Sequence, residues 1–130
     1  MITAKTLKLS LKSLREFAKK RLTDDILIEL DEKDECPLDV VRDLCSPDKV
    51  GITLLFVPEE YGGMGGNTFD VYCVCEEMAR IDLGVATSVL ATFLGSDPIT
   101  VGATPDQKKI WLTKSPRKAS CSPTAQPNPT

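Results

Sequence analysis

One run of this sequence has the composition of a β-strand, and no second run is suited to pair with it. The run is VGITLLFV at residues 50–57, and Pro58 ends it. A lone strand would leave its backbone N–H and C=O groups without partners, which is costly inside a protein. The sequence therefore predicts an all-α fold in which residues 50–57 form an extended, buried segment packed against helices.

The other apolar residues recur at helical spacing. Near the N-terminus they follow positions i, i+4, i+7, i+11 and i+15, so they share one helical face: Leu7, Leu11, Leu14, Ala18 and Leu22. Lysines and arginines take the opposite face, and the apolar stripe continues through Leu30. Pro37 suits the first position of the next helix. That helix is predicted to end before Ser46-Pro47, because a residue that precedes proline disfavours α geometry.

Two further helices are predicted between residues 67 and 95. Asn67 can cap the first, which has Asp70 near its positive end and breaks at residues 80–82. The second covers about residues 84–94 and contains only small or apolar side chains. We expect it to be the most buried element of the fold, with Gly95 as its C-cap.

A capping box predicts the last helix. Thr104-Pro105-Asp106-Gln107 combines a hydroxyl cap, a proline at the first helical position and a glutamine three residues after the cap. Ile110, Trp111 and Leu112 are expected to point inward. The body of the chain is thus predicted to be an orthogonal bundle of about six helices.

Length and composition exclude several classes of protein. The chain has 130 residues and a mass of 14.2 kDa, which suits one domain. Its 42% apolar and 27% charged residues are typical of globular proteins. The net charge of −3 and the lack of a clustered basic stretch argue against a nucleic-acid partner. The longest nearly uncharged stretch, residues 83–97, is too short and too polar to span a membrane, and the N-terminus lacks the apolar centre of a secretion signal.

The amino-acid composition provides few side chains suited to catalysis or metal binding. Histidine is absent, so the most frequent general base and the commonest metal ligand are missing. The odd number of cysteines favours buried free thiols in a reducing cytoplasm over disulfides or a zinc site: Cys36, Cys45, Cys73, Cys75 and Cys121. Adjacent carboxylates such as Glu76 and Glu77 point in different directions on a helix and are expected at the solvated surface. The glycines of residues 62–66 lack the spacing of a dinucleotide-binding loop, which favours a structural turn.

Four motifs follow one another along residues 57–109. They are VPEEYGGMG at 57–65, EEMARID at 76–82, LGSDPI at 94–99 and GATPDQKK at 102–109. In content and order they resemble the N-terminal helical domain of the acyl-CoA dehydrogenase family. The resemblance covers about residues 7–114.

This resemblance implies a flavoenzyme whose reactive groups are encoded elsewhere. Members of the family oxidise acyl-CoA thioesters: a carboxylate takes the α proton, and FAD accepts the β hydride. Electrons usually pass to an electron-transfer flavoprotein, and the subunits usually form a homotetramer. The catalytic glutamate and most flavin contacts lie in the family's middle and C-terminal domains. We therefore expect this chain alone to contain no catalytic, cofactor-binding or metal-binding residue and to be inactive, in the cytoplasm or, in a eukaryote, the mitochondrial matrix.

The resemblance also implies one substrate-binding element. The family's N-terminal domain supplies one wall of the acyl pocket, from the helix that ends in the Leu-Gly motif. By position the wall residues would be Leu90 and Leu94, one turn apart on one face. The same spacing is equally typical of ordinary core packing. An alternative function is a stand-alone helical interaction module that binds full-length dehydrogenase subunits through an exposed apolar surface.

Residues 115–130 differ from the body formed by residues 1–114. They include four of the nine prolines and no large apolar side chain, which predicts a disordered tail. The codons for residues 114–130 can also be read in the frame that begins at the third base of each codon. With a suitable choice of the degenerate bases, that frame can encode IAEEGLLFAYGATEPD. That string resembles the family's passage from the helical into the β domain. We therefore hypothesise that the reading frame slipped near Lys114–Ser115 and that the chain is truncated before its flavin site, which the downstream nucleotide sequence would test.

Overall fold

The protein is an all-α bundle. The structure, a computed structural model, describes residues 2–114, and the predicted disorder of residues 115–130 lies outside that range. Within residues 2–114 the chain forms six α-helices and two short 3₁₀ helices, and no strand occurs, which confirms the predicted fold class. The helices are α1 (Ala4–Arg21), α2 (Asp24–Lys33), α3 (Leu38–Cys45), η1 (Ile52–Phe56), η2 (Glu59–Tyr61), α4 (Thr68–Ile81), α5 (Leu83–Gly102) and α6 (Pro105–Lys114).

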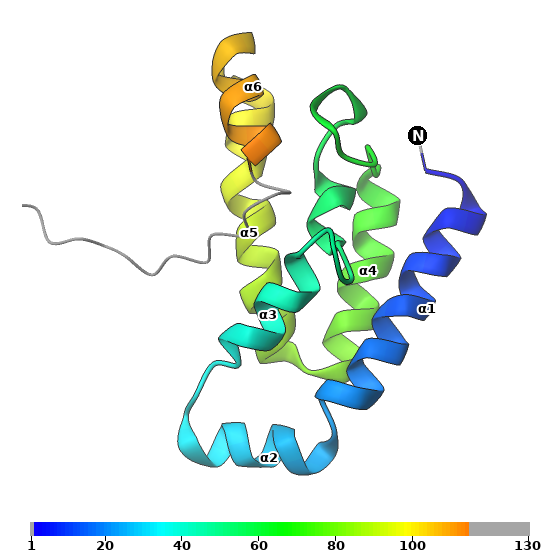
Figure 1. Ribbon diagram of the computed structural model, residues 1–130, viewed down its shortest axis with the longest axis vertical. Helices are drawn as coiled ribbons and strands as arrows, with labels where there is room; N and C mark the ends of the chain where they lie inside the picture. The colour runs from blue at the N-terminus through cyan, green and yellow to red at the C-terminus, as the bar shows by residue number, and fades with distance from the viewer. Residues whose placement is uncertain (1, 115–130) are drawn as a thin grey trace, which may run out of the picture.

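The long helices α1, α4 and α5 run alongside one another, with α3 and η1 packed among them (Figure 1). Helix α2 lies crosswise at one end of the bundle, and α6 folds back on the far end of α5. The core draws on α1, α3, η1, α4 and α5. The rings of Phe56 and Phe93 join η1 to α5, with their centroids 4.8 Å apart.

The N-terminal stripe is only partly confirmed. Leu7, Leu14, Ala18 and Leu22 are buried as predicted, but α1 ends at Arg21, and of the predicted continuation only Leu27 packs against the core, partly buried. No residue of α2 is buried. Helix α3 ends before Ser46-Pro47 as predicted, whereas Pro37 serves as its N-cap and does not occupy its first turn.

The run of residues 50–57 is buried but not extended. Gly51 has a φ of +68°, in the left-handed region that favours glycine, and this turn leads into η1. The backbone of η1 satisfies its own donors through local bonds, such as Leu54 N–H to the Gly51 carbonyl at 3.0 Å. The hydroxyl of buried Thr53 donates to the Cys45 carbonyl at 2.7 Å. Local 3₁₀ bonds, together with bonds from the backbone N–H groups of residues 64–66 to carbonyl groups of this run, thus supply what a partner strand would have supplied.

The predicted end of α5 is wrong. The helix continues through Gly95 and Pro98 to Gly102. Gly95 does not take a left-handed conformation; the glycines that do so among the described residues are Gly51, Gly62 and Gly65. Pro98 removes one backbone donor, and a helix with packing along its length can tolerate that loss. The side-chain hydroxyl of Thr100 donates to the Ser96 carbonyl in the same turn.

Candidate functional site

Leu90 and Leu94 lie on α5, one turn apart on the same side of the helix. Leu90 is partly buried against the core, whereas Leu94 is 70% exposed. Other residues extend the line in both directions at spacings of three and four. We call this line the α5 stripe; it consists of Leu83, Thr87, Leu90, Leu94, Pro98 and Val101.

Apart from Leu90, the residues of the α5 stripe are exposed and lie away from the bundle core. Val85, Ala86 and Val89 form the opposite, core-facing side and are at most 4% exposed, while Leu83 is 69% and Val101 78% exposed. The prediction that this helix is the most buried element is therefore wrong. Its sequence is apolar on both sides, and in the described chain one of these sides is largely exposed.

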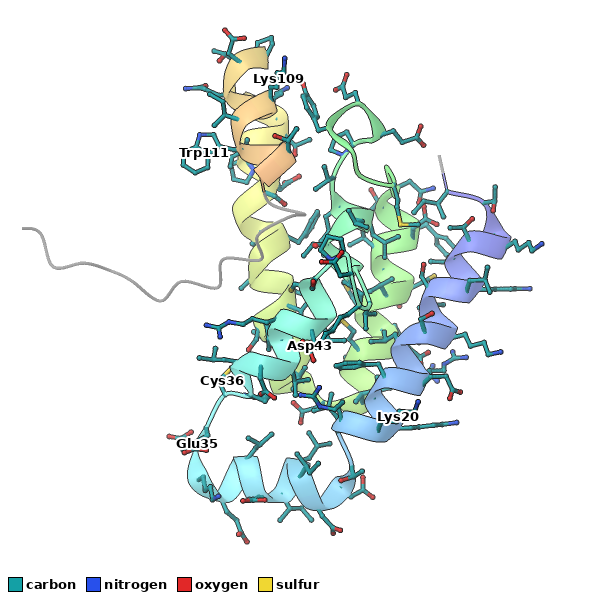
Figure 2. The ribbon with its side chains drawn as sticks, viewed as in Figure 1. Lys20, Glu35, Cys36, Asp43, Lys109 and Trp111 are labelled. Atoms are coloured by element: carbon teal, nitrogen blue, oxygen red, sulfur yellow. The ribbon has the colours of Figure 1, made fainter. Side chains whose placement is uncertain are left out.

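Helix α6 adds further exposed apolar side chains. Its capping box is confirmed: the Thr104 N–H donates to Gln107 Oε1 at 3.0 Å, and the Gln107 N–H donates to Thr104 Oγ1 at 3.4 Å. Leu112 is fully buried, as predicted. Ile110 and Trp111 are 48% and 59% exposed, which corrects the prediction that they point inward. Figure 2 shows Trp111 projecting from α6 away from the bundle.

The glycine-rich loop is a structural turn, as predicted. The backbone N–H groups of Gly63, Met64, Gly65 and Gly66 donate to carbonyl oxygens of residues 54–58. A Cβ atom on Gly63 would lie 1.9 Å from the Val57 carbonyl oxygen, so only glycine allows this approach. Because these donors are used within the protein, the loop does not present them to a phosphate group.

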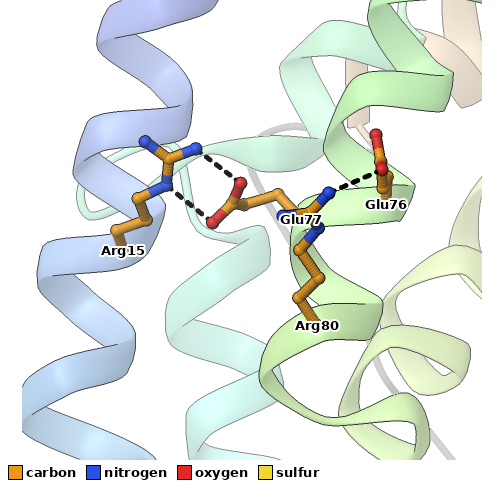
Figure 3. A network of polar contacts seen from close by, with 4 residues as sticks. All are labelled: Arg15, Glu76, Glu77 and Arg80. Atoms are coloured by element: carbon orange, nitrogen blue, oxygen red, sulfur yellow. Dashed lines mark hydrogen bonds and ion pairs between the residues drawn. The ribbon is translucent and has the colours of Figure 1, made fainter.

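The adjacent carboxylates do not form an acid–base pair. Glu76 accepts from Arg80 one turn further along α4, whereas Glu77 accepts from Arg15 of α1 (Figure 3). The hydrogen bond and positive charge of Arg15 lower the pKa of Glu77, which keeps the carboxylate ionised. Both groups therefore hold ion pairs.

The cysteines offer no metal site within residues 2–114. The four cysteines in that range form no disulfide, and no cluster of cysteine and acidic side chains there could hold a metal ion. Cys45 is buried, but Cys36 is exposed, which corrects the prediction that all are buried. Burial raises the pKa of the Cys75 thiol, so this group is protonated and unreactive. Cys121 lies outside the described residues.

Three of the open grooves on the described part of the chain have linings that can be compared, and the α5 stripe lines none of these three. The largest of these three, about 420 Å³, lies between the glycine-rich loop and α5, over Phe56 and Phe93. No lysine or arginine lines any of the three. These three grooves therefore offer no cationic side chain to the diphosphate of a flavin dinucleotide, and the backbone N–H groups of residues 63–66 are already bonded within the protein.

Comparisons with known proteins agree on one family. The family model described as "Acyl-CoA dehydrogenase, N-terminal domain" matches residues 5–117. The caffeyl-CoA reductase–Etf complex subunit CarC of Acetobacterium woodii is 32% identical over 103 residues, which cover 78% of this chain and 26% of CarC. An acyl-CoA dehydrogenase of Bacillus subtilis is 31% identical over 103 residues, with the same coverage of 78% and 26%.

The (2S)-methylsuccinyl-CoA dehydrogenase of Cereibacter sphaeroides is 32% identical over 78 residues, which cover 60% of this chain and 14% of that protein. The chain thus spans about a quarter or less of the length of these relatives.

Proposed function

Since the chain belongs to the acyl-CoA dehydrogenase family, as its N-terminal domain, we propose that it supplies one wall of the acyl pocket of an FAD-dependent oxidoreductase. The substrate is an acyl-CoA thioester, and the reaction introduces a double bond between its α and β carbons. In this proposal Leu90 and Leu94 contact the acyl chain. In this proposal, other domains of the complete enzyme supply the rest of the pocket, the catalytic base and the flavin site.

The α5 stripe carries this proposal. It runs for about five turns, bears no charged side chain and exposes three large apolar residues by 69% or more. A soluble domain rarely leaves such a line uncovered, because each exposed leucine forgoes roughly 1.5–3 kcal/mol of burial. An apolar acyl chain together with a further domain would cover it.

The acyl-wall role is testable in a chimera. Residues 5–114 of this chain replace the matching segment of the Bacillus subtilis dehydrogenase, and KM and kcat are measured for acyl-CoA substrates of increasing length. We expect Leu90→Trp to raise KM for the longest substrates by roughly tenfold while short substrates are spared, because the indole fills the far end of the pocket. Ile28→Trp on α2 is the control. A uniform loss of activity for all lengths would argue against the acyl-wall role.

We further propose that the 130-residue chain alone binds no FAD and does not turn over substrate. The hydrogen-bonded glycine-rich loop and the lack of cations in the grooves support this. The purified chain is expected to show no flavin absorbance in its protein peak after incubation with FAD. A stoichiometric flavin band would overturn the proposal.

Assembly and electron transfer are also proposed from the family. We propose that the complete enzyme is a homotetramer that passes electrons to an electron-transfer flavoprotein. The similarity to a subunit of a caffeyl-CoA reductase–Etf complex supports such an acceptor. Reduction of a purified electron-transfer flavoprotein by the chimera, followed by its flavin spectrum, would test this.

A second candidate function is an interaction module that binds full-length dehydrogenase subunits. The exposed side chains of Leu94, Val101 and Trp111 favour it, because they leave an apolar surface free for a partner. A pull-down against an intact dehydrogenase distinguishes the two functions. Selective, saturable capture would favour the module, whereas no capture, or capture of unrelated proteins to the same extent, would favour the domain of a larger enzyme.

A further inference from the structure

We propose that the outer surface of α1, together with the N-terminal end of α4, binds the surface of an anionic lipid bilayer. We call this surface the lysine–aromatic face. It consists of five exposed residues, Lys5, Lys8, Lys12, Phe69 and Tyr72. The proposal does not depend on the dehydrogenase function, because none of these residues belongs to the α5 stripe.

The lysines of this face carry charge that the described chain does not neutralise. Lys5, Lys8 and Lys12 are spaced by three and four residues, so they share one side of α1. No ion pair to another residue within 2–114 is formed by any of them. By contrast, Arg15 and Arg21, on the same helix, are paired with acidic residues. Three unneutralised positive charges therefore lie together in the N-terminal half of α1.

The Arg15–Glu77 ion pair places the aromatic residues beside these lysines. Helices α1 and α4 lie side by side and run in the same direction (Figure 1), and the ion pair fixes their register (Figure 3). Two turns before Arg15 is Lys8, and two turns before Glu77 is Asp70. Lys8 is thus level with the first turn of α4, where Phe69 lies next to Asp70.

The two aromatic side chains are not used by the core. Phe69 is 67% and Tyr72 61% exposed, although they are one turn apart on a helix that buries Asp70, Val74 and Met78. Exposed aromatic rings next to lysines are typical of proteins that lie on a membrane surface. The rings enter the headgroup region, and the lysines contact the lipid phosphates.

The shape of the face favours a bilayer over a nucleic acid. Single-stranded nucleic acid is usually held in a basic groove that follows its backbone. Each of the three grooves described above is lined by other residues. The five residues lie instead on the outside of two adjacent helices, a broad surface that suits a plane. No helix among the described residues could cross a membrane, so the binding proposed is peripheral.

The charge distribution would orient the molecule. Seven acidic residues lie on and just after α2, at the end of α1 remote from Lys5, Lys8 and Lys12, and they outnumber the basic residues Lys19, Lys20, Arg21 and Lys33 at that end: Asp24, Asp25, Glu29, Asp31, Glu32, Asp34 and Glu35. An anionic surface attracts the lysine end and repels the α2 end. The protein can therefore approach a negative bilayer with the lysine–aromatic face first despite its net charge of −3.

The test is co-sedimentation of the full 130-residue chain with vesicles. We expect binding to vesicles of phosphatidylserine and phosphatidylcholine, no binding to pure phosphatidylcholine, and loss of binding as NaCl rises. Lys8→Ala/Lys12→Ala should lower the partition coefficient by roughly 25-fold, because each lysine near the surface contributes about a fivefold factor. Phe69→Ala/Tyr72→Ala should lower it by roughly fivefold or more and leave the salt dependence in place.

Matched controls separate this face from others. Lys108→Ala/Lys109→Ala removes the same charge from α6, and Trp111→Ala removes an exposed aromatic ring there; both should bind as the wild type does. Circular dichroism establishes that each variant keeps its helical content. Three results would each overturn the proposal. The first is an equal loss of binding in the α6 variants, and the second is binding that does not depend on anionic lipid. The third is tighter binding to single-stranded DNA than to vesicles at equal phosphate concentration.

Discussion

Arg15 and Glu77 connect α1 to α4 by two parallel hydrogen bonds, from Nε to Oε1 and from Nη2 to Oε2, each of 2.6 Å. The two residues are 62 positions apart in the sequence, so the pair is a tertiary contact (Figure 3). Its two-point geometry fixes both the spacing and the register of the helices. The same pair holds Glu77 away from the neighbouring Glu76, which pairs within α4.

Arg15→Glu should destabilise the protein more than Arg15→Ala. The alanine variant loses the pair, and we expect its Tm to fall by about 1–4 °C, because ion pairs with an exposed member contribute little. The glutamate variant also places two carboxylates together. Thermal unfolding followed by circular dichroism measures both. The double variant Arg15→Glu/Glu77→Arg should recover part of the loss, and no recovery would contradict a direct pair.

Stability should decrease in acid partly because of Glu77. The hydrogen bond from Arg15 lowers the pKa of Glu77 below its ordinary value of 4.5 in the folded protein. The unfolded chain therefore binds more protons as the pH falls, so the stabilisation is present above about pH 4.5 and is lost as the pH falls through the lowered pKa. Asp43 contributes in the same sense, because hydrogen bonds from Lys49 and Arg21 lower its pKa.

The measurement is Tm against pH between about pH 6 and pH 3. Glu77→Gln should have a lower Tm than the wild type at pH 6 and a smaller decrease towards pH 3, so that the two curves converge. Glu32→Gln, at an exposed position on α2, is the control and should follow the wild-type slope. Parallel curves of Tm against pH for Glu77→Gln and the wild type would contradict the prediction that protonation of Glu77 lowers the stability in acid.

Local signals in the sequence were sufficient for the starts of α4 and α6. Asn67 and Thr104 form their capping boxes because a cap depends on residues within one turn of the chain. The all-α class followed from the lack of a partner for residues 50–57. The order of the family motifs likewise identified the domain.

Burial was harder to predict, because it depends on neighbours that are remote in sequence. Nothing in the apolar sequence of α5 distinguishes its covered side at Val89 from its open side at Leu94. Gly95 and Pro98 usually end helices, yet packing of α5 against α3, α4 and η1 keeps the helix continuous. Leu90 and Leu94 were placed on one face correctly; that they contact an acyl chain stays a prediction.

Two glycine-to-alanine substitutions should have opposite effects. At Gly63 the new Cβ would lie 1.9 Å from the Val57 carbonyl oxygen, so the turn must open and we expect a loss of about 3 kcal/mol in the free energy of unfolding. At Gly95, inside α5, the new Cβ meets nothing within 4 Å. Gly95→Ala should stabilise the protein by about 0.5–1 kcal/mol, because alanine is the better helix former. Urea unfolding measures both, and similar effects at the two positions would contradict the loop geometry.

Neighbouring residues of α6 should respond very differently to truncation. Leu112 is 0% exposed, and Leu112→Ala should cost about 2–5 kcal/mol because it leaves a cavity where α6 meets the bundle. Trp111 is 59% exposed, and Trp111→Ala should change stability by less than about 0.5 kcal/mol despite the larger side chain removed. Urea unfolding of the 130-residue chain provides the comparison. If Trp111→Ala were the more destabilising of the two, α6 would pack through its tryptophan side, and the apolar surface assigned to α5 and α6 would be smaller than described.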